Sequence, residues 1–113
     1  MHKKLEVWQL SMELVKDIYA VSKTYPQDEL FALTNQMRRC VVSIPSNIAE
    51  GSARKGNKEL IQFLHIALGS AAELETQLLI SQSLQYTFHP KHIEKINSIQ
   101  KMLYALIKYK SEH

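Results

Sequence analysis

Two glycines bracket a basic segment near the middle of the chain. The segment from Gly51 to Lys58 has a glycine spacing superficially like that of a phosphate loop, but Asn57 stands where such a loop needs a lysine. The preceding segment also has helical rather than strand spacing, so we exclude a nucleoside-triphosphate site. Free amide groups at the start of the next helix remain a candidate cradle for phosphate oxygens, with basic side chains beside them: Arg54, Lys55 and Lys58. A solvated loop that only caps the helix is the competing interpretation.

The histidines and the single cysteine do not form a recognisable catalytic or metal-binding set. His89 and His92 are three residues apart, with Glu94 as the only carboxylate at helical spacing, which is too few ligands for a closed metal site. The sequence also lacks the Glu-x-x-His pairs of di-iron bundles. Cys40 has no histidine at a spacing that would support a thiol nucleophile, and we interpret it as a small buried side chain. We therefore assign no catalytic residue, metal or cofactor, and expect that the protein is not an enzyme.

Charged and amide side chains in the centre of the chain are candidates for structural or interface roles. Arg38 flanks the apolar stripe of the second predicted helix, so it is expected to be half-buried. A half-buried arginine requires a carboxylate, and we expect Glu73 or Glu50 to be the bidentate partner, fixing helix register or a joint between subunits. Asn47 is a further candidate for a structural or interface role. Arg39 lies on the opposite face, where it either binds a phosphate or faces water.

Apolar residues recur at three- and four-residue steps through most of the chain, which predicts an all-α fold. We expect helices from about Lys4 to Thr24, Gln27 to Glu50, Asn57 to Leu84 and Pro90 to Lys110. Proline and glycine mark the three breaks, with Gly51 expected in the left-handed conformation of a helix end and Asn57 as a side-chain cap. Short links between long helices predict an up-down-up-down antiparallel four-helix bundle, a single domain spanning residues 1–113.

A proline interrupts the second predicted helix without breaking its apolar spacing. Pro45 lies within a stripe formed by Leu30, Leu33, Met37, Val41, Ile44 and Ile48. We therefore expect the helix to continue past the proline ring, to lose the hydrogen bond to the Val41 carbonyl, and to be kinked at Pro45.

The same region resembles a known protein family. The order of residues along nearly the whole chain is similar to that of the 23S rRNA-intervening-sequence proteins, which are four-helix bundles. The matching positions are Trp8, Tyr25-Pro26, Glu29, Leu33-Thr34, Gln36, Arg38-Arg39, the run from Ser43 to Gly51, Arg54, Phe63-Leu64, Ala67, Gly69-Ser70 and Glu73. The centre of the match, from Arg38 to Arg54, is specific. Cys40, where a small alanine is expected, and Leu68, where a basic residue is frequent, depart from the family pattern.

This resemblance implies an assembly state and possible partners. Similar proteins form homopentameric rings, can be encoded within insertions in ribosomal RNA genes, and include relatives that accompany reverse transcriptases. The resemblance thus implies a homopentamer, with RNA, DNA, a reverse transcriptase or another protein as candidate partners.

The first and third predicted helices carry more apolar surface than one bundle can cover. Helix one has one stripe through Leu5, Trp8, Met12, Val15 and Tyr19 and another through Val7, Leu10, Leu14, Ile18 and Val21. Helix three similarly has a second stripe of Ile61, Leu68, Ala72 and Leu79, with Ile66 and Ile80 elsewhere. A surface helix usually shows one apolar band of roughly 100°. We expect the second stripes to be buried between copies of the protein; a wide core stripe with a few exposed leucines is the alternative.

Composition sets the remaining limits. The chain has 113 residues, a formal net charge of +3, one cysteine, 3 glycines and 3 prolines, which excludes an internal disulfide and disfavours an all-β fold. The basic start, Met1 to Lys4, is followed by Glu6, Gln9 and Glu13, so we expect no signal peptide or membrane span and a cytoplasmic location.

Two functions remain open. One is a non-enzymatic oligomer that binds RNA or DNA non-specifically through its phosphates, using Arg39, Arg54, Lys55 and Lys58, with further lysines on the fourth helix: Lys91, Lys95, Lys101, Lys108 and Lys110. The other is a protein-interaction scaffold with no nucleic-acid role, in which the apolar faces bind another helix.

Overall fold

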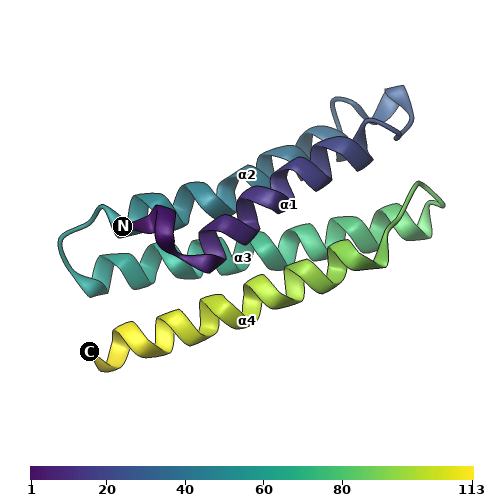
Figure 1. The fold of residues 1–113 in the computed structure, drawn as a ribbon. Helices are drawn as coiled ribbons and strands as arrows, with labels where there is room; N and C mark the ends of the chain where they lie inside the picture. The colour runs from purple at the N-terminus through teal and green to yellow at the C-terminus, as the bar shows by residue number, and fades with distance from the viewer.

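The computed structural model describes residues 1–113 as four α-helices with no strand (Figure 1). The α-helices are α1 (Glu6–Ser22), α2 (Leu33–Ser52), α3 (Asn57–Ser83) and α4 (Pro90–Glu112); short 3-10 helices, η1 (His2–Lys4) and η2 (Gln27–Glu29), precede α1 and α2. Successive helices are antiparallel, with α1 and α2 in one layer and α3 and α4 in the other. The bundle measures 46 × 23 × 20 Å. The predicted up-down-up-down antiparallel four-helix bundle is confirmed.

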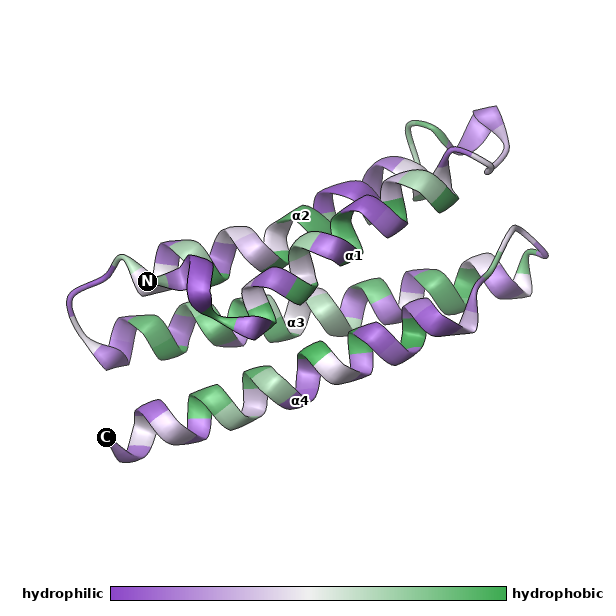
Figure 2. Ribbon diagram, in the orientation of Figure 1, coloured by the Kyte–Doolittle hydropathy of each residue, from purple (hydrophilic) through white to green (hydrophobic).

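Each helix packs against two neighbours around one core. The contacting pairs are α1 with α2, α2 with α3, α3 with α4, and α1 with α4, so α1 and α3 are diagonal. Apolar positions recur along every helix (Figure 2). The largest fully buried side chains come from all four helices and include Leu14, Ile18, Met37, Ile44, Leu74, Leu78, Ile99 and Leu103. Burial of these side chains is the main source of stability.

The second helix passes through Pro45 without interruption, as predicted. Pro45 is buried, and its nitrogen carries no hydrogen for the Val41 carbonyl. In the same turn, Nδ2 of Asn47 donates a hydrogen bond to the Ser43 carbonyl at 2.8 Å. The side chain of Asn47 therefore adds a local bond next to the one that proline removes. The bend angle itself stays a prediction.

The predicted start of the second helix at Gln27 is wrong. A 3-10 helix covers Gln27–Glu29, and Ala32, with φ −126° and ψ −107°, separates it from α2. Leu30 and Phe31 consequently lie outside the helix, 40% and 91% exposed, and Leu30 does not join the core stripe. Carboxylate Oε2 of Glu29 accepts a hydrogen bond from the Tyr86 hydroxyl at 2.7 Å. This bond ties the α1–α2 connection to the α3–α4 connection at the end of the bundle.

Gly51 and Asn57 also differ from their predicted roles. Gly51 is a buried residue inside α2, and no glycine has a positive φ. A Cβ at Gly51 would lie 2.7 Å from the Cβ of Phe63, so the glycine allows α2 and α3 to approach each other closely. Asn57 is the first residue of α3 and makes no cap; Gly56 is the N-cap residue. Nδ2 of Asn57 instead donates to the Lys110 carbonyl at 3.3 Å.

Gly51→Ala should lower the free energy of unfolding by about 1 kcal/mol or more, because the new methyl group forces α2 and α3 apart. Gly69→Ala is the matched control: a Cβ at this helical position meets nothing within 4 Å. The control should raise the free energy of unfolding by about 0.5–1 kcal/mol through better helix propensity. Urea denaturation at fixed protein concentration measures both, and equal effects of the two substitutions would contradict the close approach at Gly51.

Candidate functional site

One end of the bundle gathers most of the basic loop and both chain termini. The α2–α3 connection, η1 and the end of α4 all lie there (Figure 1). Met1, Ser52, Leu60 and Lys110 line a single cavity, which places these segments side by side. We call the lysine and arginine side chains at this end the basic pole: Lys3, Lys4, Arg54, Lys55, Lys58, Lys108 and Lys110. All of them except the half-buried Lys110 are exposed. Glu6, Glu50, Glu59 and Glu112 lie at the same end.

Arg54 contacts two other side chains at the basic pole. Its Nη2 lies 2.8 Å from Oε2 of Glu50, and its guanidinium carbon lies 4.9 Å from the centre of the Phe63 ring. Both partners of this ion pair are well exposed, so it contributes little stability. Lys55 and Lys58 have no carboxylate partner. No side chain caps the start of α3, which leaves its first amide groups free beside these lysines.

Arg39 does not join the basic pole. It is exposed and precedes Arg54 by 15 positions, which corresponds to about 22 Å along the helix axis. Arg39 lines a separate groove of about 410 Å³ between α2 and α3, together with Glu73, Ser43 and Ser70. The structure thus brings together Arg54, Lys55 and Lys58 and separates them from Arg39.

Sequence reasoning missed two members of the basic pole, Lys3 and Lys4, and did not group Lys108 and Lys110 with the central loop. The signal was present in the predicted topology, since four antiparallel helices bring both termini and the second connection to one end. Lys95, by contrast, is engaged elsewhere: its Nζ lies 2.7 Å from Asp17 and 3.6 Å from Glu13.

The expected carboxylate partner of Arg38 is wrong. Arg38 is half-buried, but its Nε donates a hydrogen bond to the Ser22 hydroxyl at 2.9 Å, and its guanidinium lies 4.9 Å from the centre of the Tyr19 ring. Glu50 pairs with Arg54 instead, and Glu73 accepts a hydrogen bond from Nε2 of Gln77 at 3.2 Å. Helical spacing predicted how deeply Arg38 is buried, but not which neighbouring helix it contacts.

Polar contacts join α2 and α3 beside the Arg39 groove. The Cys40 thiol donates to the Ser70 carbonyl at 3.0 Å, and the hydroxyls of Ser43 and Ser70 form a short hydrogen bond. Cys40 is buried, as predicted. Burial, together with the charge of Glu73, raises the pKa of the Cys40 thiol to about 12, which suppresses the reactive thiolate.

His92 is a second buried titratable group, at the contact between α4 and α1. It is 4% exposed and its Nδ1 has no hydrogen-bond partner. Burial lowers the pKa of His92; Asp17 raises it, whereas His89, Lys91 and Lys95 lower it further. No cluster of three or more histidine, cysteine, aspartate or glutamate side chains is arranged to hold a metal ion. None of the helices combines the length and apolar character that crossing a membrane requires.

Two apolar surfaces remain uncovered in the single chain. Trp8, Met12 and Val15 of α1, with Val42 and Pro45 of α2, line a groove of about 310 Å³; His2, Ser46 and Ala49 complete its lining. On α3, the exposed apolar side chains are Ile66, Leu79 and Ile80, which are 52%, 47% and 43% exposed. Met12 and Tyr19 are also exposed, at 40% and 39%. In the stripe of α1 that begins at Leu5, only Met12 and Tyr19 are exposed, whereas the stripe that begins at Val7 lies in or against the core. In the second stripe of α3, Ala72 and Leu79 are exposed and Ile61 and Leu68 are half-buried.

Comparison with known proteins identifies the family. The family model described as 23S rRNA-intervening sequence protein matches residues 3–105. The chain belongs to this family. A solved structure with a TM-score of 0.81 and 26% sequence identity covers 90% of this chain and 95% of its own. That structure is of a protein with unknown function from the S23 ribosomal protein family, from Bacteroides thetaiotaomicron. The comparison with curated proteins found no match.

Cys40 of this intervening-sequence protein should resist alkylation in the folded state. At pH 8, the rise in thiol pKa from 9.0 to about 12 lowers the thiolate fraction by a factor on the order of 10³. Iodoacetamide labelling followed by mass spectrometry should be slow in buffer and fast in denaturing urea. Equal labelling rates in the two conditions would contradict the buried thiol.

Mild acid should destabilise the protein through His92. The folded-state pKa of His92 is below that of the unfolded chain, so the unfolded chain binds the proton more readily as pH falls through about 6.5. The free energy of unfolding should therefore decrease from pH 7 to pH 5. His92→Leu should flatten this decrease, whereas His65→Leu, at an exposed position on α3, should keep the wild-type pH dependence. An unchanged profile in His92→Leu would refute the assignment.

Proposed function

We propose that this intervening-sequence protein is a non-enzymatic homo-oligomer that binds RNA or DNA through the phosphate backbone, with the basic pole as its contact surface. The observation that carries the proposal is the convergence of the α2–α3 loop with lysines from both ends of the chain. Lysine and arginine side chains bind phosphates by charge and release counterions, which requires no base-specific geometry. We therefore expect binding without sequence preference and with a strong dependence on salt.

The free amide groups at the start of α3 support the same surface. They point out of a helix end whose partial positive charge attracts phosphate oxygens. Lys55 and Lys58 flank this helix end without carboxylate partners. Arg39 is a separate candidate phosphate contact on the α2–α3 groove.

The uncovered apolar surfaces support self-association. Because α1 and α3 are diagonal in the bundle, their outward faces lie on different sides of the protomer. A contact between two different faces is head-to-tail, and such contacts generate a ring when the rotation closes. We infer that the α1–α2 groove of one copy receives the exposed α3 side chains of the next. The number of copies, five, comes from the family resemblance.

A protein-interaction scaffold is the second candidate function. The observation in its favour is the apolar lining of the α1–α2 groove, beside the buried Pro45. An amphipathic helix of another protein, such as a reverse transcriptase, could lay its apolar face there. In that case the basic residues serve solubility, and the protein would not bind nucleic acid even at low salt.

Replacing basic-pole charges should weaken nucleic-acid binding and reduce its salt dependence. We expect Lys55→Gln combined with Lys58→Gln to bind generic RNA and duplex DNA more weakly at every salt concentration. Because each lost phosphate contact removes about 0.7–0.9 from the slope of log affinity against log salt, the slope should fall by about 1–2. Fluorescence anisotropy across a salt series measures both quantities.

The matched control for this experiment is Lys16→Gln combined with Lys91→Gln, which removes the same charge from exposed positions outside the basic pole. This control should keep the wild-type slope. Equal weakening by both double variants would reject the basic pole as the contact surface, and no binding by the wild type at low salt would leave the scaffold function.

Charged substitutions on either apolar surface should block self-association. Met12→Asp damages the α1 side of the proposed joint and Leu79→Asp the α3 side, so each variant alone should be monomeric by light scattering. An equimolar mixture should form a two-protomer complex, because one intact surface of each kind is then available.

The mixing experiment separates the modes of association. A joint formed by the same face on both copies would leave at least one of the two variants self-associated on its own. A wild-type protein that is monomeric at all concentrations would reject self-association altogether, and would favour a wide core stripe with exposed leucines.

A further inference from the structure

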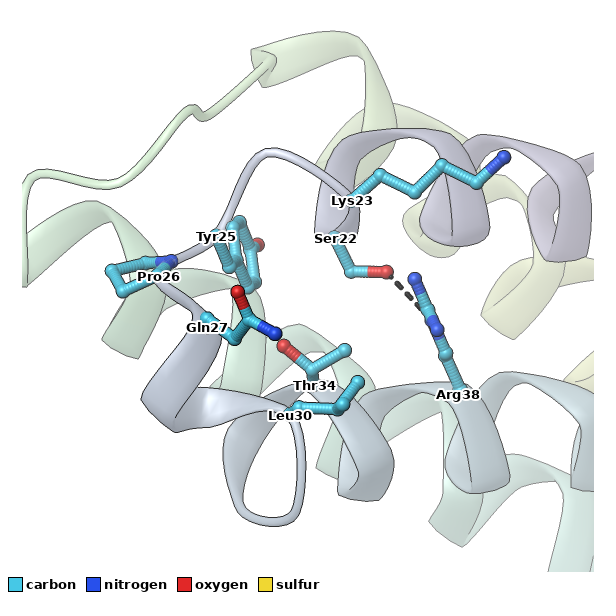
Figure 3. Close-up of a pocket in the computed structure, with 8 residues that line it drawn as sticks. All are labelled: Ser22, Lys23, Tyr25, Pro26, Gln27, Leu30, Thr34 and Arg38. Carbon is cyan, nitrogen blue, oxygen red and sulfur yellow. Dashed lines mark hydrogen bonds between the residues drawn. The ribbon is translucent and has the colours of Figure 1, made fainter.

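A polar cavity lies at the opposite end of the bundle from the basic pole, where α1 ends and α2 begins. It has a volume of about 260 Å³, and its lining residues are Ser22, Lys23, Tyr25, Pro26, Gln27, Leu30, Thr34 and Arg38 (Figure 3). Two of these residues are cationic and none is acidic. The lining therefore carries positive charge and no negative charge.

Arg38 has more donor groups than its surroundings use. A guanidinium offers five N–H donors, and the hydrogen bond from Nε to Ser22 uses one of them. Arg38 forms no ion pair with any carboxylate of the chain. A half-buried cation without a carboxylate is costly, so a bound anion would stabilise this arrangement.

The carbonyl groups at the end of α1 do not serve as acceptors for the unused N–H groups of Arg38. The carbonyls of Tyr19, Val21 and Ser22 already accept hydrogen bonds from the amides of Lys23, Thr24 and Tyr25 respectively. The Val21 carbonyl also accepts a bond from the Thr24 hydroxyl at 2.6 Å. Arg38 therefore faces helix-end carbonyls that are already paired, and its terminal nitrogens remain available.

Further donors reach the same cavity from the α2 side. Thr34 is 2% exposed, and Figure 3 shows its hydroxyl oxygen and the Gln27 amide turned toward each other across from Arg38. The one hydrogen bond between side chains of the eight lining residues is that from Arg38 to Ser22. Among the lining residues, the buried polar atom without a hydrogen-bond partner is the hydroxyl of Tyr25. Lys23 runs along the rim, pointing away from the centre.

We propose that this cavity binds a phosphate monoester, with Arg38 as the principal ligand and Thr34 and Gln27 as further hydrogen-bonding partners. A guanidinium fork matches phosphate oxygens in a bidentate geometry, and neutral hydroxyl and amide donors complete the contact. Lys23 can swing over the rim as a mobile point charge. The ligand is either a small phosphorylated molecule or the 5′-phosphate at the end of a nucleic acid. The site is distinct from the basic pole and does not require it.

The test is a titration of the wild-type protein with inorganic phosphate at constant ionic strength, followed by nuclear magnetic resonance. Saturable shifts are expected for the amides of Ser22, Gln27 and Arg38 and for the Arg38 Nε signal. Arg38→Gln should weaken phosphate affinity at least tenfold, whereas Lys16→Gln, which removes an exposed positive charge from α1 outside both proposed contact surfaces, should leave it within twofold. Thr34→Val keeps the side-chain shape and should weaken phosphate affinity about threefold. This variant replaces Arg38→Gln as the test if Arg38→Gln does not fold.

Further arms identify the source of the phosphate. Tighter binding of a short oligonucleotide with a 5′-phosphate than of one without, lost in Arg38→Gln, supports the site and assigns the nucleic-acid end. If inorganic phosphate and 5′-AMP saturate the site, but oligonucleotides with and without a 5′-phosphate bind equally, the site is supported and its ligand is a small molecule. Absence of saturable shifts, equal loss in Lys16→Gln, or acetate binding as tightly as phosphate would overturn the proposal. Failure of the salt-dependent binding at the basic pole would leave these readouts unchanged.

Discussion

Gly51 has no side chain, and α2 therefore lies so close to α3 that an added Cβ would be 2.7 Å from the Cβ of Phe63. Farther along the same pair of helices, the Cys40 thiol bonds to the Ser70 carbonyl and the Ser43 hydroxyl meets that of Ser70. The steric contact sets the spacing of the two helices and the polar contacts set their register. Helices α1 and α4 then pack on a pair whose geometry is already determined.

The two ends of this bundle have different chemistry. At one end, the α2–α3 loop meets both termini and places Arg54 over the Phe63 ring. At the other end, the two remaining connections are joined by the contact of Tyr25 with Tyr86 and by the hydrogen bond from Tyr86 to Glu29. The first end is open and basic, whereas the second encloses a cavity beside Arg38. Membership of the 23S rRNA-intervening-sequence family makes a nucleic-acid partner a natural hypothesis for the first end.

Much of the fold was predictable because helix formation follows local spacing. The apolar periodicity predicted four helices and the passage of α2 through Pro45. It also predicted more apolar surface on α1 than the core covers, and Met12 and Tyr19 are exposed there. The failures occurred where a distant residue decides the outcome. Glycine after a helix usually marks its end, but Phe63 gives Gly51 a packing role instead. The partner of Arg38 depended in the same way on which helix lies beside it, and spacing along one helix does not contain that information.

The placement of both termini and the α2–α3 loop at one end has a consequence for any cyclic assembly. Rotation about a ring axis repeats each protomer without inverting it, so joints along the sides of the bundles leave every copy pointing the same way. Such a ring is sided: one rim carries all the basic poles and the opposite rim carries all the Arg38 cavities. A long polyanion that touches one copy is then held at high effective concentration near the others, on that rim alone.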